Sequence, residues 1–194
     1  MASSHIRVGT FEFFASRGQY NDVRALANYS IQRHFPDLKS NKDKYLGLLN
    51  AVSQRHAELI AQWMSFGFIH GVMNTDNMAI CGETIDYGPC AFMDEYNPDQ
   101  VFSSIDHSGR YKYSNQPKVA MWNLSRLAET LLPLIADKPE DAVQDAEKVI
   151  ESFNSHYDNF FRKLMIKKIG ISPLNSCEEP KLFKHVQTFL AILK

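Results

Sequence analysis

Apolar residues recur at three- and four-residue spacing along most of this chain, which predicts helices. The clearest stretch runs from about Asn41 to Phe66. A helix is also predicted before it, from about Asn21 to Phe35, because Asn is a favoured N-cap and Pro36 restricts the residue before it. The apolar positions of the longer stretch share one helical face: Tyr45, Leu48, Leu49, Val52, Leu59, Ile60 and Trp63. His56 falls on that face and is predicted to be a hydrogen-bonded core histidine.

The second half of the chain repeats this helical pattern. One helix is predicted from Pro117, a residue suited to a first helical turn, and it continues through Leu131. Another follows Pro139 and stops at Gly170, and a short last helix is predicted from about Pro180 to Leu193. Residues 94–115 are rich in turn formers and are predicted to form a loop.

One segment departs from the helical period. Between Met78 and Asp86, two short apolar runs flank Gly82 and Glu83, which suits a small β-hairpin. We find no internal repeat, low-complexity tract or interdomain linker. The predicted fold class is therefore mainly α with a small β-hairpin, in one unit over residues 1–194.

Composition narrows the classes of function. The chain has 44% hydrophobic and 22% charged residues and a net charge of −1, which argues against nucleic acid or an anionic membrane as partner. No apolar run approaches the roughly 20 residues that span a bilayer. The N-terminus lacks a secretory pattern, and the three cysteines (Cys81, Cys90 and Cys177) form no CxxC pair. Cytoplasmic location is predicted.

The segment HGVMNTDNMAICGETIDYGP, residues 70–89, carries the candidate chemistry. Asp76, Asn77 and Asp86 bring two carboxylates and a carboxamide into a short stretch, and such oxygen ligands suit Mg²⁺ or Mn²⁺. The alternative is that Asp76 and Asn77 form only a polar turn that Asp86 caps, since Asn-Thr-Asp-Asn is prone to turns.

The order of these residues follows that of the protein-kinase C-terminal lobe. His70 aligns with the His of the kinase catalytic loop and Asn77 with its metal-binding Asn, and Asp86-Tyr87-Gly88 stands in the place of Asp-Phe-Gly. The position of the kinase catalytic Asp is occupied by Val72, which cannot accept a proton. A conventional kinase is therefore not expected, and Asp76 is the nearest carboxylate that could orient or deprotonate a hydroxyl.

Several long motifs resemble the selenoprotein O family (SelO, or YdiU in bacteria). They are SSHIRVGTFEFF, HGVMNTDNMAI, TIDYGPCAFMDEY, DHSGRY and NQPKVAMWNLSRLAETL, and together they cover about residues 3–132. The resemblance implies a protein-kinase-like fold and a protein adenylyltransferase that moves AMP from ATP to protein hydroxyls (Ser, Thr or Tyr). It also implies a cytosolic location in bacteria and a mitochondrial one in eukaryotes.

The resemblance also implies a role for each site residue. Asp76 is expected to be the catalytic proton acceptor. Asn77 is expected to bind Mg²⁺, and Asp86 to bind Mg²⁺ and face the ATP. Arg7 is expected to contact the nucleotide phosphates, for which the planar guanidinium is suited. The expected partners are ATP and protein substrates.

Departures from the family pattern leave alternatives open. The N-terminal ATP-binding lobe, with its glycine-rich loop, and a C-terminal tail are expected to be absent from residues 1–194. One alternative is therefore a truncated, catalytically inactive pseudokinase fragment that retains metal binding or a protein-interaction role. Another is an all-helical interaction module in which the polar cluster is only a turn.

Overall fold

The computed structural model describes residues 2–170, 183–186 and 188. Five helices account for most of the described part: α1 (Val8–Ala15), α2 (Tyr20–His34), α3 (Lys44–Phe66), α4 (Gln116–Ile135) and α5 (Pro139–Lys168). Short 3₁₀ turns lie at Pro36–Leu38, Thr75–Asn77 and Tyr113–Asn115. The mainly helical fold class is thus confirmed.

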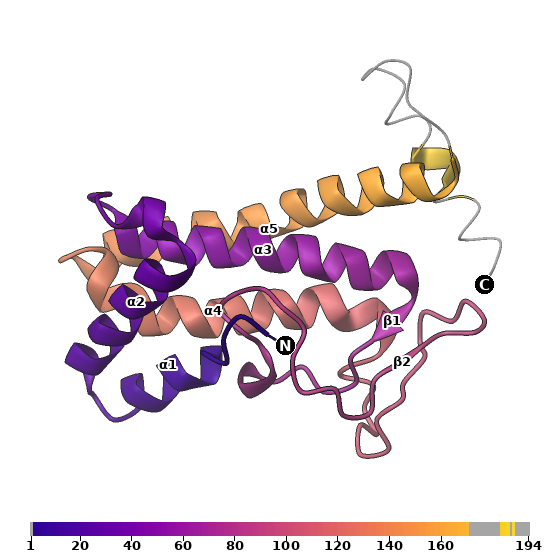
Figure 1. Cartoon of the computed structure of the whole chain (residues 1–194), viewed down its shortest axis with the longest axis horizontal. Coiled ribbons are helices and arrows are strands. Elements are labelled where there is room, and N and C mark those ends of the chain that lie inside the picture. The colour runs from indigo at the N-terminus through magenta and orange to yellow at the C-terminus, as the bar shows by residue number, and fades with distance from the viewer. Residues whose placement is uncertain (1, 171–182, 187, 189–194) are drawn as a thin grey trace.

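The three long helices, α3, α4 and α5, run alongside one another and enclose the main core (Figure 1). Their fully buried side chains include Leu48, Leu49, Leu124, Leu127 and Phe153. In the view of Figure 1, α1 and α2 lie toward one end and the small sheet toward the other. The loops that carry the candidate chemistry leave α3 and return to α4, so the long helices form their base.

The ends of these helices follow from local sequence. Gly67 adopts the left-handed conformation (φ 72°) and ends α3, as glycine does at many helix C-termini. Pro117 and Pro139 stand in the first turns of α4 and α5, where the missing N–H costs no hydrogen bond. The helices predicted over residues 21–35 and 41–66, and those predicted to begin at Pro117 and Pro139, therefore agree with the structure within a few residues.

The two-stranded sheet is not where the sequence pattern placed it. Its strands are β1 (Phe68–Ile69) and β2 (Ala91–Phe92), which pair antiparallel with Phe68 opposite Phe92 and Ile69 opposite Ala91. The hairpin predicted over residues 78–86 is wrong, because this segment contains no strand beyond an isolated bridge from Ala79 to Arg7.

The physical reason is that the 78–81 run pairs with a distant partner. All four of its residues are buried: Met78, Ala79, Ile80 and Cys81. Its backbone bonds the N-terminal segment, with Val8 N–H donating to the Met78 carbonyl (3.0 Å) and Ile80 N–H to the Ile6 carbonyl (2.8 Å). Gly82 (φ 74°) does form a turn, but the turn does not lead back into a second strand.

The two ends of the chain and the long loop complete the comparison of predicted and observed elements. Helix α1 was not predicted, because its eight residues are too few for a helical period to show. The last predicted helix, 180–193, lies mostly outside the described residues, although 183–186 and 188 are helical. The 94–115 loop is irregular apart from the 3₁₀ turn at its end, as predicted.

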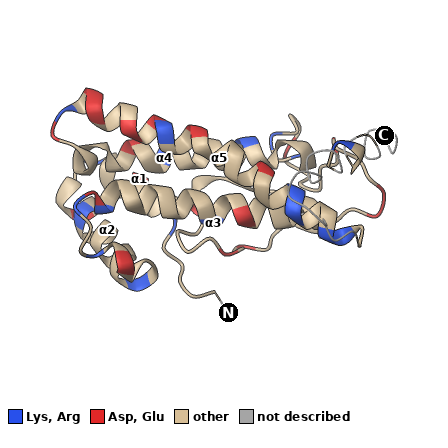
Figure 2. Cartoon of the chain, turned by 90° about the horizontal axis from the view of Figure 1, so that it is seen from above, with Lys and Arg blue, Asp and Glu red and all other residues tan. Residues whose placement is uncertain are grey.

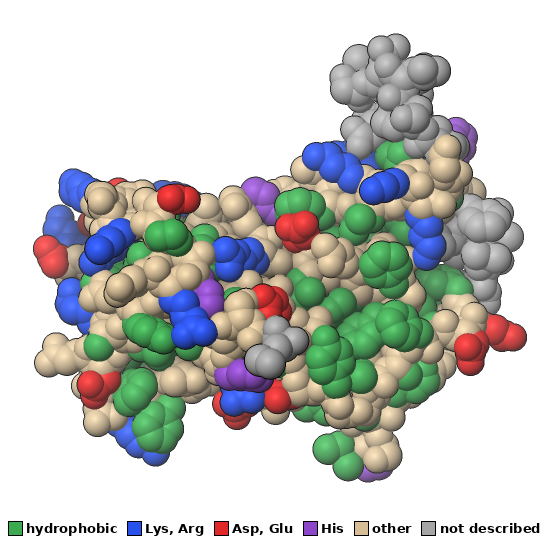
Figure 3. Space-filling model, in the orientation of Figure 1, with side chains coloured by type: hydrophobic (Ala, Val, Ile, Leu, Met, Phe, Trp, Pro, Cys, Tyr) green, Lys and Arg blue, Asp and Glu red, His purple; other side chains and the backbone are tan. Residues whose placement is uncertain are grey.

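The surface carries mixed charge. Figure 2 shows both acidic and basic residues along the described helices. On the face drawn in Figure 3, hydrophobic side chains gather near the β1–β2 end, where Phe92 is 64% exposed. In the described part of the chain, no helix combines the length and apolar character needed to cross a membrane.

Candidate functional site

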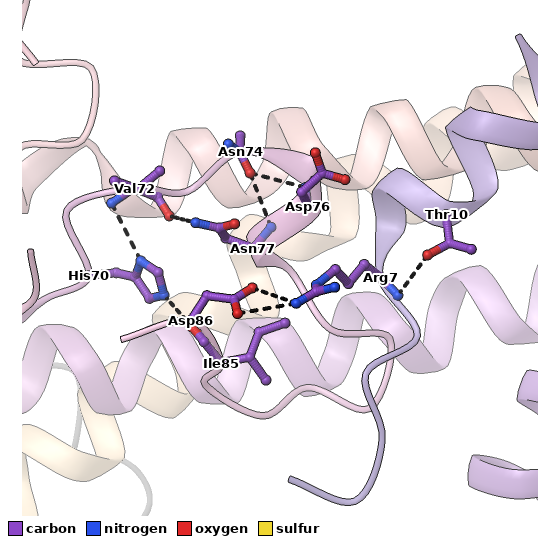
Figure 4. A network of polar contacts seen from close by, with 9 residues as sticks. All are labelled: Arg7, Thr10, His70, Val72, Asn74, Asp76, Asn77, Ile85 and Asp86. Atoms are coloured by element: carbon purple, nitrogen blue, oxygen red, sulfur yellow. Dashed lines mark hydrogen bonds and ion pairs between the residues drawn. The ribbon is translucent and has the colours of Figure 1, made fainter. Parts of the chain in front are cut away.

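The loop that follows β1 is held by an asparagine. The side-chain oxygen of Asn74 accepts hydrogen bonds from the backbone N–H groups of Asp76 and Asn77, both at 3.1 Å (Figure 4). Asn74 thereby caps the 3₁₀ turn Thr75–Asn77. The backbone of both predicted site residues is therefore fixed by a side chain of the same loop.

The amide of Asn77 has a defined orientation. Its Nδ2 donates to the Val72 carbonyl at 3.0 Å, which leaves Oδ1 as the free acceptor of the carboxamide. Asn77 is half-buried, and its bond to Val72 fixes the direction in which Oδ1 points. An amide oxygen oriented in this way is a suitable ligand for a hard cation.

His70 ties the loop to the segment before Asp86. The buried ring donates from Nε2 to the Ile85 carbonyl (2.8 Å), while Nδ1 accepts from the Val72 N–H (3.4 Å). Burial lowers the pKa of His70, and the hydrogen bond to Ile85 only partly opposes this effect. A neutral imidazole with its proton on Nε2 satisfies both bonds, so His70 acts as a fixed link.

Asp86 has an unusual backbone. Its φ of 56° makes it the one non-glycine residue with positive φ in the described ranges. Asp tolerates this region better than most residues, and such conformations concentrate at functional sites. The Gly88 N–H closes the turn on the Asp86 carbonyl at 2.8 Å. The chain thus bends sharply at the residue whose carboxylate is predicted to bind the metal.

The guanidinium of Arg7 binds this carboxylate. Arg7 Nη2 lies 3.1 Å from Oδ1 and 3.0 Å from Oδ2 of Asp86 (Figure 4). Both side chains are about one-third exposed, at 34% and 37%, so the pair contributes little to stability. An exposed pair of this kind can exchange partners when a phosphate or a cation enters.

Asp76 faces a different direction. Its side chain is exposed and lies against Gly9 of α1, and in Figure 4 its carboxylate points away from Asp86. The structure therefore joins Arg7 to Asp86 directly and links Asn77 to Asp86 through Val72, His70 and Ile85. It places Asp76 on the α1 side of the same loop.

Two supporting residues escaped the sequence analysis. Gln116 is fully buried, accepts from the His70 N–H at 3.0 Å and donates to the Phe68 carbonyl at 2.9 Å. Asn123, also fully buried, donates to the Met73 carbonyl at 2.9 Å. Both are amides on the buried side of α4, and a polar residue within an apolar helical stripe is the signal that could have found them.

The donor atoms of Asn77 and Asp86 supply only part of a ligand set for the expected Mg²⁺. In the described part of the chain, no three His, Cys, Asp or Glu side chains cluster as a metal site would require. Asn77 and Asp86 offer hard oxygen ligands, and Mg²⁺ commonly binds one or two carboxylates together with substrate phosphates and water. The residues thus fit an ion that arrives with a polyphosphate rather than one enclosed by protein ligands alone.

An open hollow of about 640 Å³ borders this site. Its lining combines apolar and polar side chains, including His5, Leu59, Glu83, Asp86 and Tyr87. The volume lies within the range of small-molecule sites. Space for a ligand the size of a nucleotide is therefore present beside Asp86.

Comparison with known proteins identifies the relatives. The family model described as "Protein adenylyltransferase SelO" matches residues 1–194. The chain is 54% identical over 194 residues to the protein nucleotidyltransferase YdiU of Rhizobium etli (strain CIAT 652), covering 100% of this chain and 38% of that protein. It is 55% identical over 171 residues to that of Shouchella clausii (88% and 35%) and 49% identical over 194 residues to that of Bacillus cereus (98% and 40%). The chain thus spans about two fifths of the length of these relatives.

Proposed function

Because this chain belongs to the SelO family of protein adenylyltransferases, we propose that its site takes part in the transfer of AMP from ATP to protein hydroxyls. The observation that carries this proposal is the pairing of the Arg7 guanidinium with the Asp86 carboxylate. His70, through its bonds to Ile85 and Val72, links the backbone before Asp86 to the loop that orients the Asn77 amide. The same membership, with the order of α3, the His70 loop and Asp86, supports a kinase-like C-terminal lobe for residues 1–194.

The proposed reaction is a displacement at the α-phosphorus. A substrate hydroxyl attacks, the bond to the bridging oxygen breaks, and pyrophosphate leaves, so that AMP remains on the hydroxyl oxygen. In this proposal Arg7 neutralises phosphate charge, and Asn77 and Asp86 would hold a Mg²⁺ that would supply further positive charge to the phosphates. The exposed carboxylate of Asp76 is accessible to a protein hydroxyl and takes its proton. Val72, at the kinase-base position, takes no part.

Labelled ATP tests the proposal. The chain is incubated with Mg²⁺ or Mn²⁺, a set of candidate proteins, and ATP labelled at the α- or the γ-phosphate. We expect label on protein from α-labelled ATP alone, lost in Asp86→Asn and retained in the control Asp137→Asn, an exposed residue between α4 and α5. Transfer from γ-labelled ATP alone would instead indicate a kinase.

The outcome without transfer is also informative. Measurable Mn²⁺ binding that Asp86→Asn abolishes, with no label on protein, would favour the alternative of a fragment that binds metal without catalysis. Unchanged metal and nucleotide binding in both Asp76→Asn and Asp86→Asn would favour the interaction module.

We further propose that the protein works in the cytoplasm. Cys81 and Cys90, the cysteines in the described ranges, are both free thiols, which accords with a reducing compartment. Cell fractionation with an antibody to the chain tests this location.

A further inference from the structure

The first turn of α1 lies between the two acidic residues of the site. Arg7, its N-cap residue, binds Asp86, and Gly9, two residues later, packs against Asp76. The turn is fixed to the loop by backbone bonds on both sides of Arg7: Val8 N–H to the Met78 carbonyl and Ile80 N–H to the Ile6 carbonyl. These bonds join α1 to the residues directly after Asn77, so the turn and the loop form one unit.

Gly9 leaves the space that the Asp76 side chain occupies. A Cβ at Gly9 would overlap Asp76 Oδ1 and would lie 3.0 Å from its Cγ and 3.4 Å from its Cα. Rotation of the carboxylate about the Cβ–Cγ bond would leave Cγ at 3.0 Å, so the whole Asp76 side chain would have to move to relieve the contact. The backbone of Gly9 is helical and has no positive φ that would call for glycine. Alanine is the better helix former, so local propensity does not explain a glycine here either.

Electrostatics favours the same arrangement. The first N–H groups of a helix have no intrahelical acceptor and attract negative charge. Helix α1 has no acidic residue in its first turn, and the exposed carboxylate of Asp76 lies against that turn from another segment. The negative Asp76 carboxylate thus lies next to the positive N-terminal end of the α1 dipole.

We propose that Gly9 is a positioning residue, whose missing side chain lets the first turn of α1 hold the Asp76 carboxylate at a set place relative to Asp86. The geometric part of this inference stands on contacts within the chain. Its catalytic part rests on the proposed function, which makes Asp76 the proton acceptor.

The first test needs no catalysis. Gly9→Ala is compared with Gly47→Ala, a control in which a helical glycine of α3 faces only the flexible end of Leu38, 3.1 Å from the added Cβ. We expect Gly9→Ala to shift the NMR signals of the Asp76 carboxyl and of the 74–78 amides, and to lower the melting temperature, with Gly47→Ala changing neither group of signals. Unchanged Asp76 signals in Gly9→Ala would overturn the proposal.

A double variant separates this contact from a general loss of folding. The overlapping Oδ1 and Cγ atoms are absent in Asp76→Ala, so Gly9→Ala should lower the melting temperature less in that background than in the wild type, even if Gly9→Ala alone folds poorly. An equal loss in both backgrounds would show that Gly9 does not act through Asp76.

Kinetics then tests the catalytic part. If the chain transfers AMP, Gly9→Ala should lower kcat by roughly tenfold or more with little change in KM for ATP, because a misplaced base affects the chemical step. In the Asp76→Asn background it should cause no further loss, and additive losses would contradict the positioning role. If Gly9→Ala shifts the Asp76 signals but the wild type transfers no AMP, the positioning of the Asp76 carboxylate by Gly9 would be supported and the proposed function rejected.

Discussion

At His56, burial decides both the hydrogen bond and the protonation state. The ring lies on the inner face of α3, and its Nε2 donates to the Ala79 carbonyl at 2.8 Å. Burial lowers the pKa of His56 to about 4, and the bond to Ala79 only partly opposes this. His70 is shifted in the same direction for the same main reason. The predicted core histidine is thus confirmed.

These shifts predict how stability depends on pH. An unfolded histidine binds a proton near pH 6.5, whereas folded His56 binds one only near pH 4, so the unfolded state holds more protons between these values. The stability that comes from keeping His56 neutral should therefore be complete above pH 6.5. As the pH drops from 6.5 toward 4, the free energy of unfolding should fall by about 1.4 kcal/mol per pH unit for one such group. Urea unfolding at pH 7.5, 6.0 and 5.0 measures this dependence.

The matched variant for this prediction is His56→Gln, whose amide can still donate to the Ala79 carbonyl but does not titrate. It should show a shallower loss of stability over the same pH range. An identical slope in the variant and the wild type would contradict the assignment to His56.

At the scale of elements, α4 holds the loop in place through two buried amides. Gln116 makes two direct hydrogen bonds to the segment that begins the loop, at His70 and Phe68, whereas Asn123 makes one, at Met73. The Oδ1 of Asn123 has no hydrogen-bond partner. The two amides therefore differ in how many backbone groups would lose a partner on substitution.

This difference predicts an order of stability losses. Gln116→Leu should lower the free energy of unfolding more than Asn123→Leu, because it strands two buried backbone groups rather than one, at about 1–3 kcal/mol each. Asn123→Leu also removes an unpaired polar atom, which offsets part of its loss. Urea unfolding of both variants at one pH gives the comparison, and a larger loss in Asn123→Leu would contradict it.

The elements also show how far the sequence pattern could reach. Helices α2, α3, α4 and α5 follow from side chains that repeat within a few residues, so their periods are visible locally. The 78–81 run was misassigned because its partner segment, Ile6–Val8, lies 70 or more residues earlier in the chain. All residues of that run are buried, instead of alternating between buried and exposed. This pattern is typical of a segment that other parts of the fold cover on both sides.

At the scale of the whole molecule, Mg²⁺ and ATP should bind together. If Asn77 and Asp86 hold the ion as proposed, they are too few to bind it tightly without phosphate oxygens, and the ion would also have to compete with Arg7 for the Asp86 carboxylate. A ligand that binds only the folded state stabilises it by about 2.7 kcal/mol at one hundred times its Kd. Mg²⁺ with ATP should therefore raise the melting temperature more than either alone.

Thermal unfolding measures this coupling. Addition of EDTA should remove most of the shift, and Asp86→Asn should reduce it, whereas Asp137→Asn should not. An equal melting-temperature shift from ATP in the presence of EDTA would show that ATP binds without Mg²⁺, and would contradict the proposed metal ligands.

The sequence alone determined which residue types stand near one another along the chain. From these follow the long helices, the candidate oxygen ligands of residues 76–86 and the resemblance to the SelO family, which the family match confirms. Tertiary structure decided the contacts between residues that are distant in the sequence. These are the Arg7–Asp86 pair, the bonds of the two α4 amides to the loop, and the contact of Gly9 with Asp76. The physical reason is range. Helical periods arise from neighbours three and four residues apart, whereas these contacts join groups that come together only when α1 and α4 close around the loop.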